Sequence, residues 1–387
     1  MKKVAIGQAG GPTAVINATL AGFVKEIERD YSLLFIQNGY EGFAHGSLLD
    51  GDEEMLHKIH LHRDVPGACL GSGRYPLSDD HIEQGVRQLK EKNVEMLVFI
   101  GGNGTMEALA KVELEARRQN YPLQVLGLPK TVDNDLGGTD HAPGFGSSAR
   151  YVAQATRDMS RDLASMQNFE KIRVLETMGR NAGWLASASG LLQEYEEEGP
   201  HFIALPERPL KQELLLQNVD CALRRFGHAT VVVSEGVHWS EEGQVQREVV
   251  DGRPVLGGIS SEVAAFLKSE LRVMTRAELL GMNQRSFSAV ISDIDREEAY
   301  TVGKVGAEWI RDGLSGVMVS IKRKSHHRYS VDMIPIELEK VVEAGERVMP
   351  VEFIKDRKRY YEWLKPLIGE DVTTYPPPLK GKELYVD

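Results

Sequence analysis

The sequence is poor in cysteine, in positive charge and in long apolar runs, and each shortage removes a class of protein. Two cysteines, Cys69 and Cys221, cannot form a disulfide framework and are typical of a reducing compartment. Lys and Arg number 46 against 57 Asp and Glu, and the net charge of −11 disfavours a general nucleic-acid or membrane-surface role. The first apolar run, Val4–Ile6, stops at Gly7, which is too short for a secretory signal, and no run of about 18 apolar residues follows. We therefore expect a cytoplasmic protein with neither a nucleic-acid nor a membrane partner.

What the chain does have is a globular composition and an excess of glycine. Hydrophobic residues make up 42% and charged residues 27% of 387 residues, enough for a sizeable core and for two or three domains. The 38 glycines exceed the usual share, which is about 7%. The positions of these glycines carry most of the functional information.

Short apolar runs alternate with segments of helical spacing, the pattern of a parallel α/β sheet. A helix is predicted from about Ala14, another over 80–92, and a long amphipathic one after Ser147. We predict an α/β protein of two Rossmann-like three-layer lobes with mostly parallel sheets and the active site in the cleft between them. The first lobe takes residues 1–146 plus about 284–335, and the second about 147–283 plus 336–387. The expected strands are 4–6, 96–100, 125–128, 172–175, 202–205 and 229–233.

Three of these strands end in segments with unusual chemistry. Gly10–Thr13 and Gly101–Thr105 are glycine turns that precede helices, and backbone N–H groups in such turns can bind phosphate oxygens. No Walker A lysine follows, which excludes a P-loop NTPase. The third segment, Pro129–Asp135, places two carboxylates beside a lysine and a threonine, a combination suited to proton removal from a hydroxyl near phosphate or magnesium. Ligands of α/β sheets bind beyond these strand ends, so we expect one site there.

In these segments the sequence resembles the phosphofructokinase family, enzymes that phosphorylate fructose 6-phosphate at its 1-hydroxyl. The resemblance runs in order over residues 4 to 320, and the Pro-Lys-Thr-Val-Asp-Asn-Asp and Met-Gly-Arg motifs are its most specific parts. The residues that match the family are 10–12 with Asn17, 39–42, 71–75, 101–105, 129–135, 178–180, 234–236, and Arg276 with 280–285.

The resemblance implies a role for each matching residue. Asp133 would be the general base, Asp135 would help to place Mg²⁺ and orient the base, and Thr131 would bond near the transferred phosphoryl group. Asn103 and Asp135 would be the protein's Mg²⁺ ligands. The phosphoryl-donor side would comprise Gly10, Tyr40, Arg74, Tyr75, Gly102, Asn103, Gly104 and Thr105. The sugar phosphate would contact Thr131, Asp133, Lys171, Met178, Gly179, Arg180, Glu235, Arg276, Met282 and Arg285, with Arg180 also catalytic and Arg276 and Arg285 clamping the 6-phosphate. The family also implies a homodimer or homotetramer whose active sites are completed across subunits.

Several positions depart from the family pattern. Asn103 replaces an acidic residue of many relatives, Lys171 replaces an arginine, and Met282 replaces a histidine and cannot donate a hydrogen bond. Ser286–Phe287 replaces a Gly-Gly pair. These changes weaken the assignment of fructose 6-phosphate itself more than that of the family.

Two residues bear on the phosphoryl donor. Pyrophosphate-using relatives typically have an aspartate where this chain has Gly104, and glycine leaves the space of the nucleotide α-phosphate open and uncharged. Lys130, by contrast, matches the pyrophosphate-using branch. We give the missing aspartate more weight and expect ATP as the donor.

Three hypotheses follow: an ATP-dependent 6-phosphofructokinase of glycolysis, a reversible pyrophosphate–fructose 6-phosphate 1-phosphotransferase, and a non-catalytic sugar-phosphate sensor. The sequence does not decide whether sedoheptulose 7-phosphate is also used.

Two charged segments are interpreted as solvated surface, the acidic run 194–198 and the basic cluster 322–328, which contains His326 and His327. An effector site is the alternative for the basic cluster.

Overall fold

The computed structural model describes residues 1–240, 243–250, 253–324 and 329–379. The chain forms two compact units, and each is made from two segments of sequence. Unit 1 comprises Met1–Ser147 and Arg285–Arg347, and unit 2 comprises Ser148–Gln284 and Val348–Asp387. His326 and His327 of the basic cluster lie outside the described residues. The interpretation of this cluster as solvated surface was wrong for Arg323, whose side chain is 8% exposed and lies 3.4 Å from Asp140.

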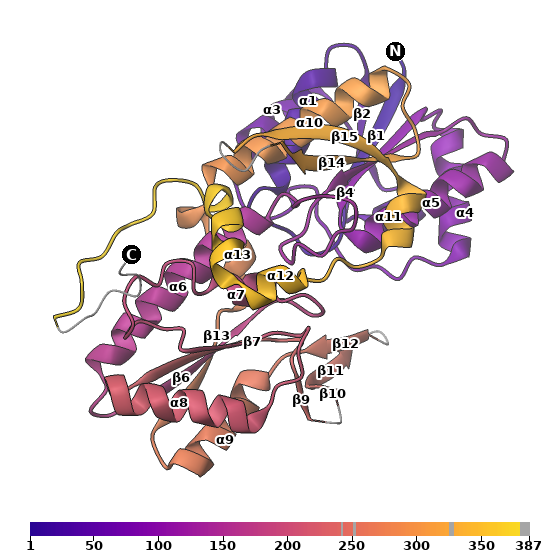
Figure 1. Ribbon diagram of the computed structural model, residues 1–387. Coiled ribbons are helices and arrows are strands. Elements are labelled where there is room, and N and C mark those ends of the chain that lie inside the picture. The colour runs from indigo at the N-terminus through magenta and orange to yellow at the C-terminus, as the bar shows by residue number, and fades with distance from the viewer. Residues whose placement is uncertain (241–242, 251–252, 325–328, 380–387) are drawn as a thin grey trace. The chain divides into compact units, whose positions relative to one another are not determined.

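Unit 1 is built on a seven-stranded sheet in the order β15-β14-β5-β4-β1-β2-β3 (Figure 1). Its inner strands pair in parallel, and only the outermost strands, β15 and β3, are antiparallel to their neighbours. The strands are β1 (Lys3–Gln8), β2 (Ser32–Ile36), β3 (Leu48–Asp50), β4 (Met96–Gly101), β5 (Gln124–Pro129), β14 (Val317–Arg323) and β15 (Val331–Glu337).

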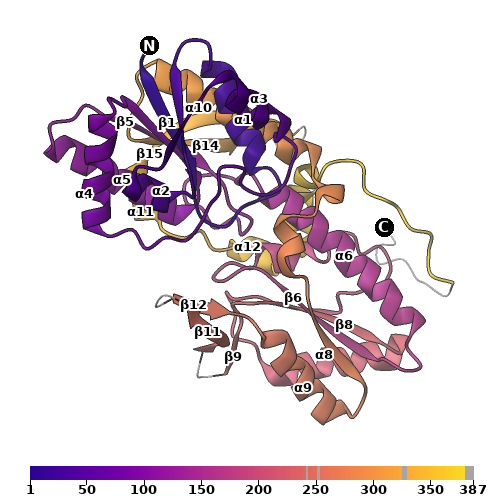
Figure 2. The same cartoon turned by 180° about the vertical axis from the view of Figure 1, so that it is seen from behind.

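Helices cover both faces of this sheet, because alternate strand residues point to opposite sides and both sides are apolar. One core joins the strands to α1, α3 and α10, with Phe23 and Ile310 among its buried residues. The other joins them to α2, α4, α5 and α11 around Phe43 and Phe99 (Figure 2). The helices are α1 (Ile16–Ile27), α2 (Tyr40–His45), α3 (Glu53–Leu61), α4 (Asp79–Glu91), α5 (Asn103–Arg118), α10 (Asp293–Arg311) and α11 (Leu338–Ala344), with the short 3₁₀ turn η2 (Ser288–Val290).

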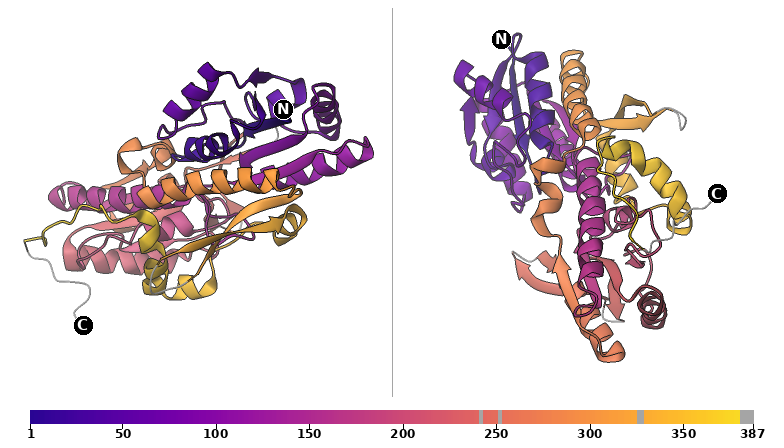
Figure 3. Two further views of the ribbon diagram at one scale, coloured as in Figure 1. Left: turned by 90° about the horizontal axis from the view of Figure 1, so that it is seen from above. Right: turned by 90° about the vertical axis from the view of Figure 1, so that its left-hand side faces the viewer.

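Unit 2 has a four-stranded, wholly parallel sheet in the order β13-β6-β8-β7. One face packs against α8 and α9, and residues of α6 and α7 pack on the other. Figure 3 shows α6 and α10 as long, uninterrupted helices. The main elements are α6 (Phe145–Ser165), β6 (Ile172–Thr177), α7 (Trp184–Ala188), β7 (Phe202–Ala204), α8 (Gln212–Phe226), β8 (Ala229–Ser234), α9 (Ile259–Leu271) and β13 (Thr275–Leu279). The remaining ones are the hairpins β9 (His238–Ser240) with β10 (Gly243–Gln244) and β11 (Gln246–Val250) with β12 (Arg253–Leu256), then η1 (Gly281–Arg285), α12 (Val351–Lys355), α13 (Arg357–Leu364) and η3 (Lys365–Ile368).

The prediction of an α/β protein with mostly parallel sheets is confirmed, and each expected strand lies within an observed one or overlaps it. The chain returns to unit 2 after Arg347 rather than near residue 335, because β15 pairs with β14 in the sheet of unit 1. The expectation that 194–198 is fully solvated was wrong for Glu198, which is buried and paired with Arg161 at 2.6 Å. Among the described residues, no helix is both long and apolar enough to cross a membrane.

Candidate active site

In unit 1 the three unusual segments lie at one edge of the sheet. Strands β1, β4 and β5 are parallel neighbours, with Ile100 level with Gln8 and Gly101 level with Pro129. Their carboxyl ends therefore bring the two glycine turns and the segment 129–135 together, as the sequence predicts.

A buried lysine contacts the first glycine turn. Lys130 is only 4% exposed, and its Nζ donates a 2.6 Å hydrogen bond to the carbonyl of Gly11. Gly10 has φ +76°, a conformation that favours glycine, and a Cβ there would lie 3.4 Å from Nζ of Lys130. A Cβ on Gly11 would lie 2.8 Å from a terminal nitrogen of Arg285. The glycines thus allow two cations to approach the backbone closely.

Three cations and two carboxylates interact at this edge. Burial lowers the pKa of Lys130 to about 8, although Asp135 and Asp133 oppose the shift, and Arg285 and Arg74 lower it further. Burial and Arg74 also lower the pKa of Arg285, while Asp133 raises it. Cations that repel one another in this way are suited to binding a multiply charged anion. The assignment of Arg285 to the sugar phosphate stays a prediction, and in unit 1 its guanidinium lies beside Gly11.

The segment 129–135 is ordered by its own side chains. The hydroxyl of Thr131 donates to Oδ1 of Asp135 at 3.0 Å and accepts the backbone N–H of Asp133 at 3.1 Å. Nδ2 of Asn103 donates to the carbonyl of Asp135 at 2.9 Å and ties this segment to the second glycine turn. Burial raises the pKa of Asp135, and Thr131 counteracts the shift. The amide of Asn134 is buried without a hydrogen-bond partner among the described residues.

The second glycine turn opens α5. Gly104 lies in its first turn and is exposed, and a Cβ built there meets no atom within 4 Å. Gly102 precedes the helix, and Thr105 is buried. Tyr40 is buried with its hydroxyl donating to the carbonyl of Thr105 at 3.2 Å, so it supports this turn from beneath. Tyr75 lies at a partly exposed position between His45 and His81.

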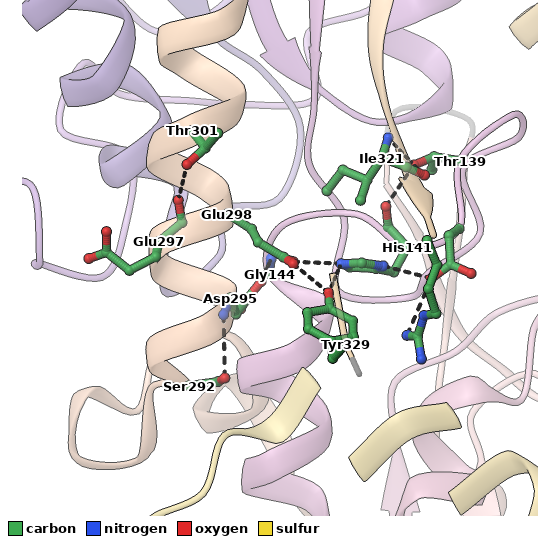
Figure 4. Close-up of polar contacts among 12 residues, drawn as sticks. Thr139, His141, Gly144, Ser292, Asp295, Glu297, Glu298, Thr301, Ile321 and Tyr329 are labelled. Carbon is green, nitrogen blue, oxygen red and sulfur yellow. Dashed lines mark hydrogen bonds and ion pairs between the residues drawn. The ribbon is translucent and has the colours of Figure 1, made fainter. Parts of the chain in front are cut away.

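A buried polar network fixes the chain that follows this segment, as Figure 4 shows. Nε2 of His141 lies 2.6 Å from Glu298 on α10, and its Nδ1 lies 2.9 Å from Asp140. The hydroxyl of Tyr329 donates to Glu298. Burial alone would lower the pKa of His141, but the two carboxylates outweigh it and raise the pKa to about 9.

A second buried carboxylate holds the start of α6 (Figure 4). Asp295 accepts the N–H of Gly144 at 2.8 Å and both the N–H and the hydroxyl of Ser147. Thr139 meanwhile bonds to the backbone of Ile321 in β14. Residues 139–147 are therefore fixed to α10 and β14, and the carboxylates before them have a rigid support.

In unit 2 the predicted sugar residues fall into two groups. Met178, Gly179, Arg180 and Glu235 follow the carboxyl ends of β6 and β8, where Thr177 is level with Ser234. The Ser234 hydroxyl donates to the carbonyl of Gly179 at 2.5 Å. Met282, which is 60% exposed, lies in η1, and Gln284 of the same turn accepts the N–H of Met178 at 2.9 Å.

Lys171 and Arg276 lie at the opposite, amino end of the same sheet. Lys171 immediately precedes β6, and Arg276 of β13 is level with Arg173. Nε of Arg276 lies 3.3 Å from Glu170, a buried carboxylate that the sequence analysis missed. The available signal was Arg173, a charged residue inside an otherwise apolar strand, because a buried guanidinium requires a carboxylate partner.

The described residues contain no cluster of three or more His, Cys, Asp and Glu side chains arranged to hold a metal ion. Asp133, Asp135 and Asn103 nevertheless carry side-chain oxygens, and a hydrogen bond from Asn103 to the carbonyl of Asp135 joins the two segments that bear them. This set fits Mg²⁺, which commonly binds one or two carboxylates and takes its other ligands from water and substrate phosphates.

Comparison with known proteins identifies the family. The phosphofructokinase family model matches residues 3–310. The sulfofructose kinase of Alkalicoccus urumqiensis is 45% identical over 366 residues, with 95% of each chain covered. The pyrophosphate–fructose 6-phosphate 1-phosphotransferase of Xanthomonas campestris pv. campestris is 35% identical, covering 95% of this chain and 92% of its own. An ATP-dependent 6-phosphofructokinase 2 of Clostridium perfringens is 29% identical, covering 90% and 96%.

Solved structures agree with this assignment. The pyrophosphate-dependent phosphofructokinase of Marinobacter aquaeolei superimposes with a TM-score of 0.86 at 31% identity, over 100% of this chain and 98% of its own. Members of this family generally use a divalent metal together with the phosphoryl donor. The chain belongs to the phosphofructokinase family and is a phosphotransferase enzyme.

Proposed function

We propose that the protein transfers the γ-phosphoryl group of ATP to the 1-hydroxyl of a fructose that carries an anionic group at C6, with fructose 6-phosphate, the acceptor that several relatives name, as the first candidate. The observation that carries the proposal is the grouping of Asp133 and Asp135 with Lys130, Arg74 and Arg285 beside two glycine turns. Phosphoryl transfer depends mainly on alignment and charge stabilisation, and this grouping supplies both.

In the proposed reaction Asp133 accepts the proton of the 1-hydroxyl as the new P–O bond forms and the bond to ADP breaks. Thr131 and Asn103 hold the segment that carries the base, through their bonds to Asp135. Lys130 and Arg74 offset the charge of the donor phosphates. Mg²⁺, held by Asp135 and Asn103 with the donor, would neutralise charge on the phosphate oxygens.

ATP is the proposed donor because of Gly104. A Cβ at this position meets nothing within 4 Å, so the space beside the glycine turn can take a nucleotide α-phosphate. Pyrophosphate is the alternative donor, supported by Lys130 and by several relatives that are named for it.

A second acceptor is favoured by specific residues. Lys171 and Met282 replace the arginine and histidine that the family pattern uses around the 6-phosphate, and both changes weaken recognition of a dianion. The relative that is 45% identical is named a sulfofructose kinase, a name that denotes a fructose with a sulfo group as the acceptor. A fructose with a sulfonate at C6 is therefore the second candidate.

We also propose a homodimer or homotetramer. A strand rises about 3.3 Å per residue, so Lys171 and Met178 lie about 20 Å apart along β6, farther than one hexose phosphate can reach. Residues at both ends can contact one sugar only if two subunits each contribute one end. The edge of unit 2 supports this arrangement, since Met274, Leu279 and Met282 on and beside the edge strand β13 are 39%, 48% and 60% exposed.

The proposal is tested by initial rates with Mg²⁺, fructose 6-phosphate and either ATP or pyrophosphate, for the wild type and for Asp133→Ser. We expect turnover with ATP, and a loss of at least about 10³-fold in kcat for the variant with sugar-phosphate binding retained. Turnover only with pyrophosphate would mean that the protein is the reversible pyrophosphate-dependent phosphotransferase. Binding without turnover on any donor or acceptor would support a sensor.

A further inference from the structure

A buried carboxylate lies between two arginines at the amino ends of β6 and β13. The Glu170 side chain is 4% exposed, and its two oxygens accept hydrogen bonds from Arg173 at 2.9 and 3.1 Å. The oxygen bonded at 3.1 Å also lies 3.3 Å from Nε of Arg276, whose side chain is 52% exposed. Arg173 is itself shared, since it donates to Asp162 at 2.7 Å.

This arrangement limits the positive charge that an anion meets there. Arg173 and Arg276 contribute two positive charges and Glu170 and Asp162 two negative ones, so these four paired groups carry no net charge. Lys171, the residue after Glu170, adds one positive charge. Because Glu170 is buried, water screens its charge poorly, and its repulsion of a nearby anion is stronger than that of a surface carboxylate. This group of residues at the amino ends of β6 and β13 thus matches one negative charge better than two.

We infer, on the basis of the proposed function, that this site selects an acceptor whose C6 group is a singly charged sulfonate over one with a phosphate, and that Glu170 is the positioning residue that sets this preference. Both groups present three terminal oxygens, although the phosphate is joined to C6 through a bridging oxygen and reaches one bond farther than a sulfonate bonded directly to carbon. The property on which Glu170 acts is charge, because a sulfonate carries −1 and a phosphate monoester about −1.5 to −2 at pH 7.

Glu170 acts through Arg276. Its contact is with Nε, which leaves the N–H groups of the two terminal nitrogens to bond oxygens of the ligand. The Glu170 carboxylate orients the guanidinium of Arg276 and reduces the positive electrostatic potential around it. The Met282 side chain has no hydrogen-bond donor, so it cannot stabilise the second negative charge of a phosphate.

The first test uses the wild-type enzyme and needs no variant. With ATP and Mg²⁺, kcat/KM is measured for the ketohexose 6-sulfonate and the 6-phosphate between pH 5.5 and 8.5. We expect the sulfonate to be preferred by about tenfold at pH 8, as one weakly screened charge interaction allows. The KM for the phosphate should fall toward pH 6, where the group takes up a proton (pKa about 6), relative to the KM for the sulfonate. A preference for phosphate at pH 8, with parallel pH profiles, would overturn the inference.

The second test assigns the effect to Glu170. Glu170→Gln keeps the shape and one hydrogen-bond acceptor but removes the charge, and should shift the sulfonate-to-phosphate ratio toward phosphate by about three- to tenfold. Glu198→Gln is the matched control, because Glu198 is also buried and paired with an arginine in unit 2, and it should leave the ratio unchanged. Equal ratios in the wild type and Glu170→Gln would refute this role. Transfer to neither ketose would overturn the proposed function itself, whereas transfer to both with phosphate preferred would overturn only this inference.

Discussion

At the scale of single residues, Gly104 makes the donor assignment testable. The first turn of α5 can carry a side chain at this position, because a Cβ meets nothing within 4 Å. Gly104→Asp should therefore fold normally while placing a carboxylate where the α-phosphate of ATP is proposed to lie. We expect kcat/KM for ATP to fall by about 10²-fold, from charge repulsion and lost space, and that for pyrophosphate to change by less than about threefold. Steady-state rates with both donors measure this.

Gly104→Ala is the control for that substitution, since it adds a methyl group without charge and improves helix propensity. It should retain most of its activity with ATP. If alanine and aspartate reduce ATP use equally, the space itself matters and the charge does not. Equal loss on both donors would contradict the placement of the α-phosphate.

Candidate site residues can be selected from the sequence alone when they belong to local motifs. Gly10, Gly104 and Asp133 belong to contiguous motifs at strand ends, and the fold brings those ends together. Burial of Lys130 beneath the first turn, and the sharing of Glu170 by two arginines, depend on packing between distant segments. No spacing rule in one sequence encodes such contacts.

At the scale of elements, the network around His141 links the segment behind Asp135 to α10. The folded-state pKa of about 9 exceeds the ordinary value of 6.5, so the stabilisation is fully present below about pH 6.5 and is lost as the pH rises through 9. A shift of this size corresponds to about 3 kcal/mol. We predict that the free energy of unfolding falls by an amount of that order between pH 7 and 10 because of this one group. Denaturant unfolding at a series of pH values measures it.

Glu298→Gln should remove most of this pH dependence, because Glu298 is the main cause that raises the pKa of His141. His60→Asn is a suitable control, since His60 also pairs with a glutamate, at 2.7 Å, but is partly exposed. An unchanged slope in Glu298→Gln would show that His141 does not titrate in this range. Sequence reasoning could not find this pair, because 157 residues separate its members.

The elements themselves were largely predictable because apolar runs and helical spacing fix them locally. The outer pair β14 and β15 was not expected, and it explains why residues up to Arg347 belong to unit 1. Antiparallel edge pairing depends on where a long connection returns, which composition and periodicity leave open.

At the scale of the whole molecule, the proposed sharing of active sites predicts complementation between two inactive variants. Arg276→Ala removes a side chain at the amino end of the unit 2 sheet, which a subunit is proposed to contribute to its partner's active site. Asp133→Ser removes the general base, which a subunit contributes to its own active site. A mixed dimer then has one site with both residues intact. If co-expressed chains associate at random, about one quarter of wild-type activity should return, because half the dimers are mixed and each has one intact site of two.

The control for complementation is a second pair of variants that damage the same site. Co-expression of Asp133→Ser with Asp135→Ser should not restore activity. Both substitutions lie in the segment 129–135, so the segment in every active site carries one of them. Recovery in the first pair and none in the second would require Arg276 to act in the partner's site. Full activity of Arg276→Ala alone, or no recovery in verified mixed dimers, would place the C6 group elsewhere, and the 20 Å separation along β6 would then need another explanation.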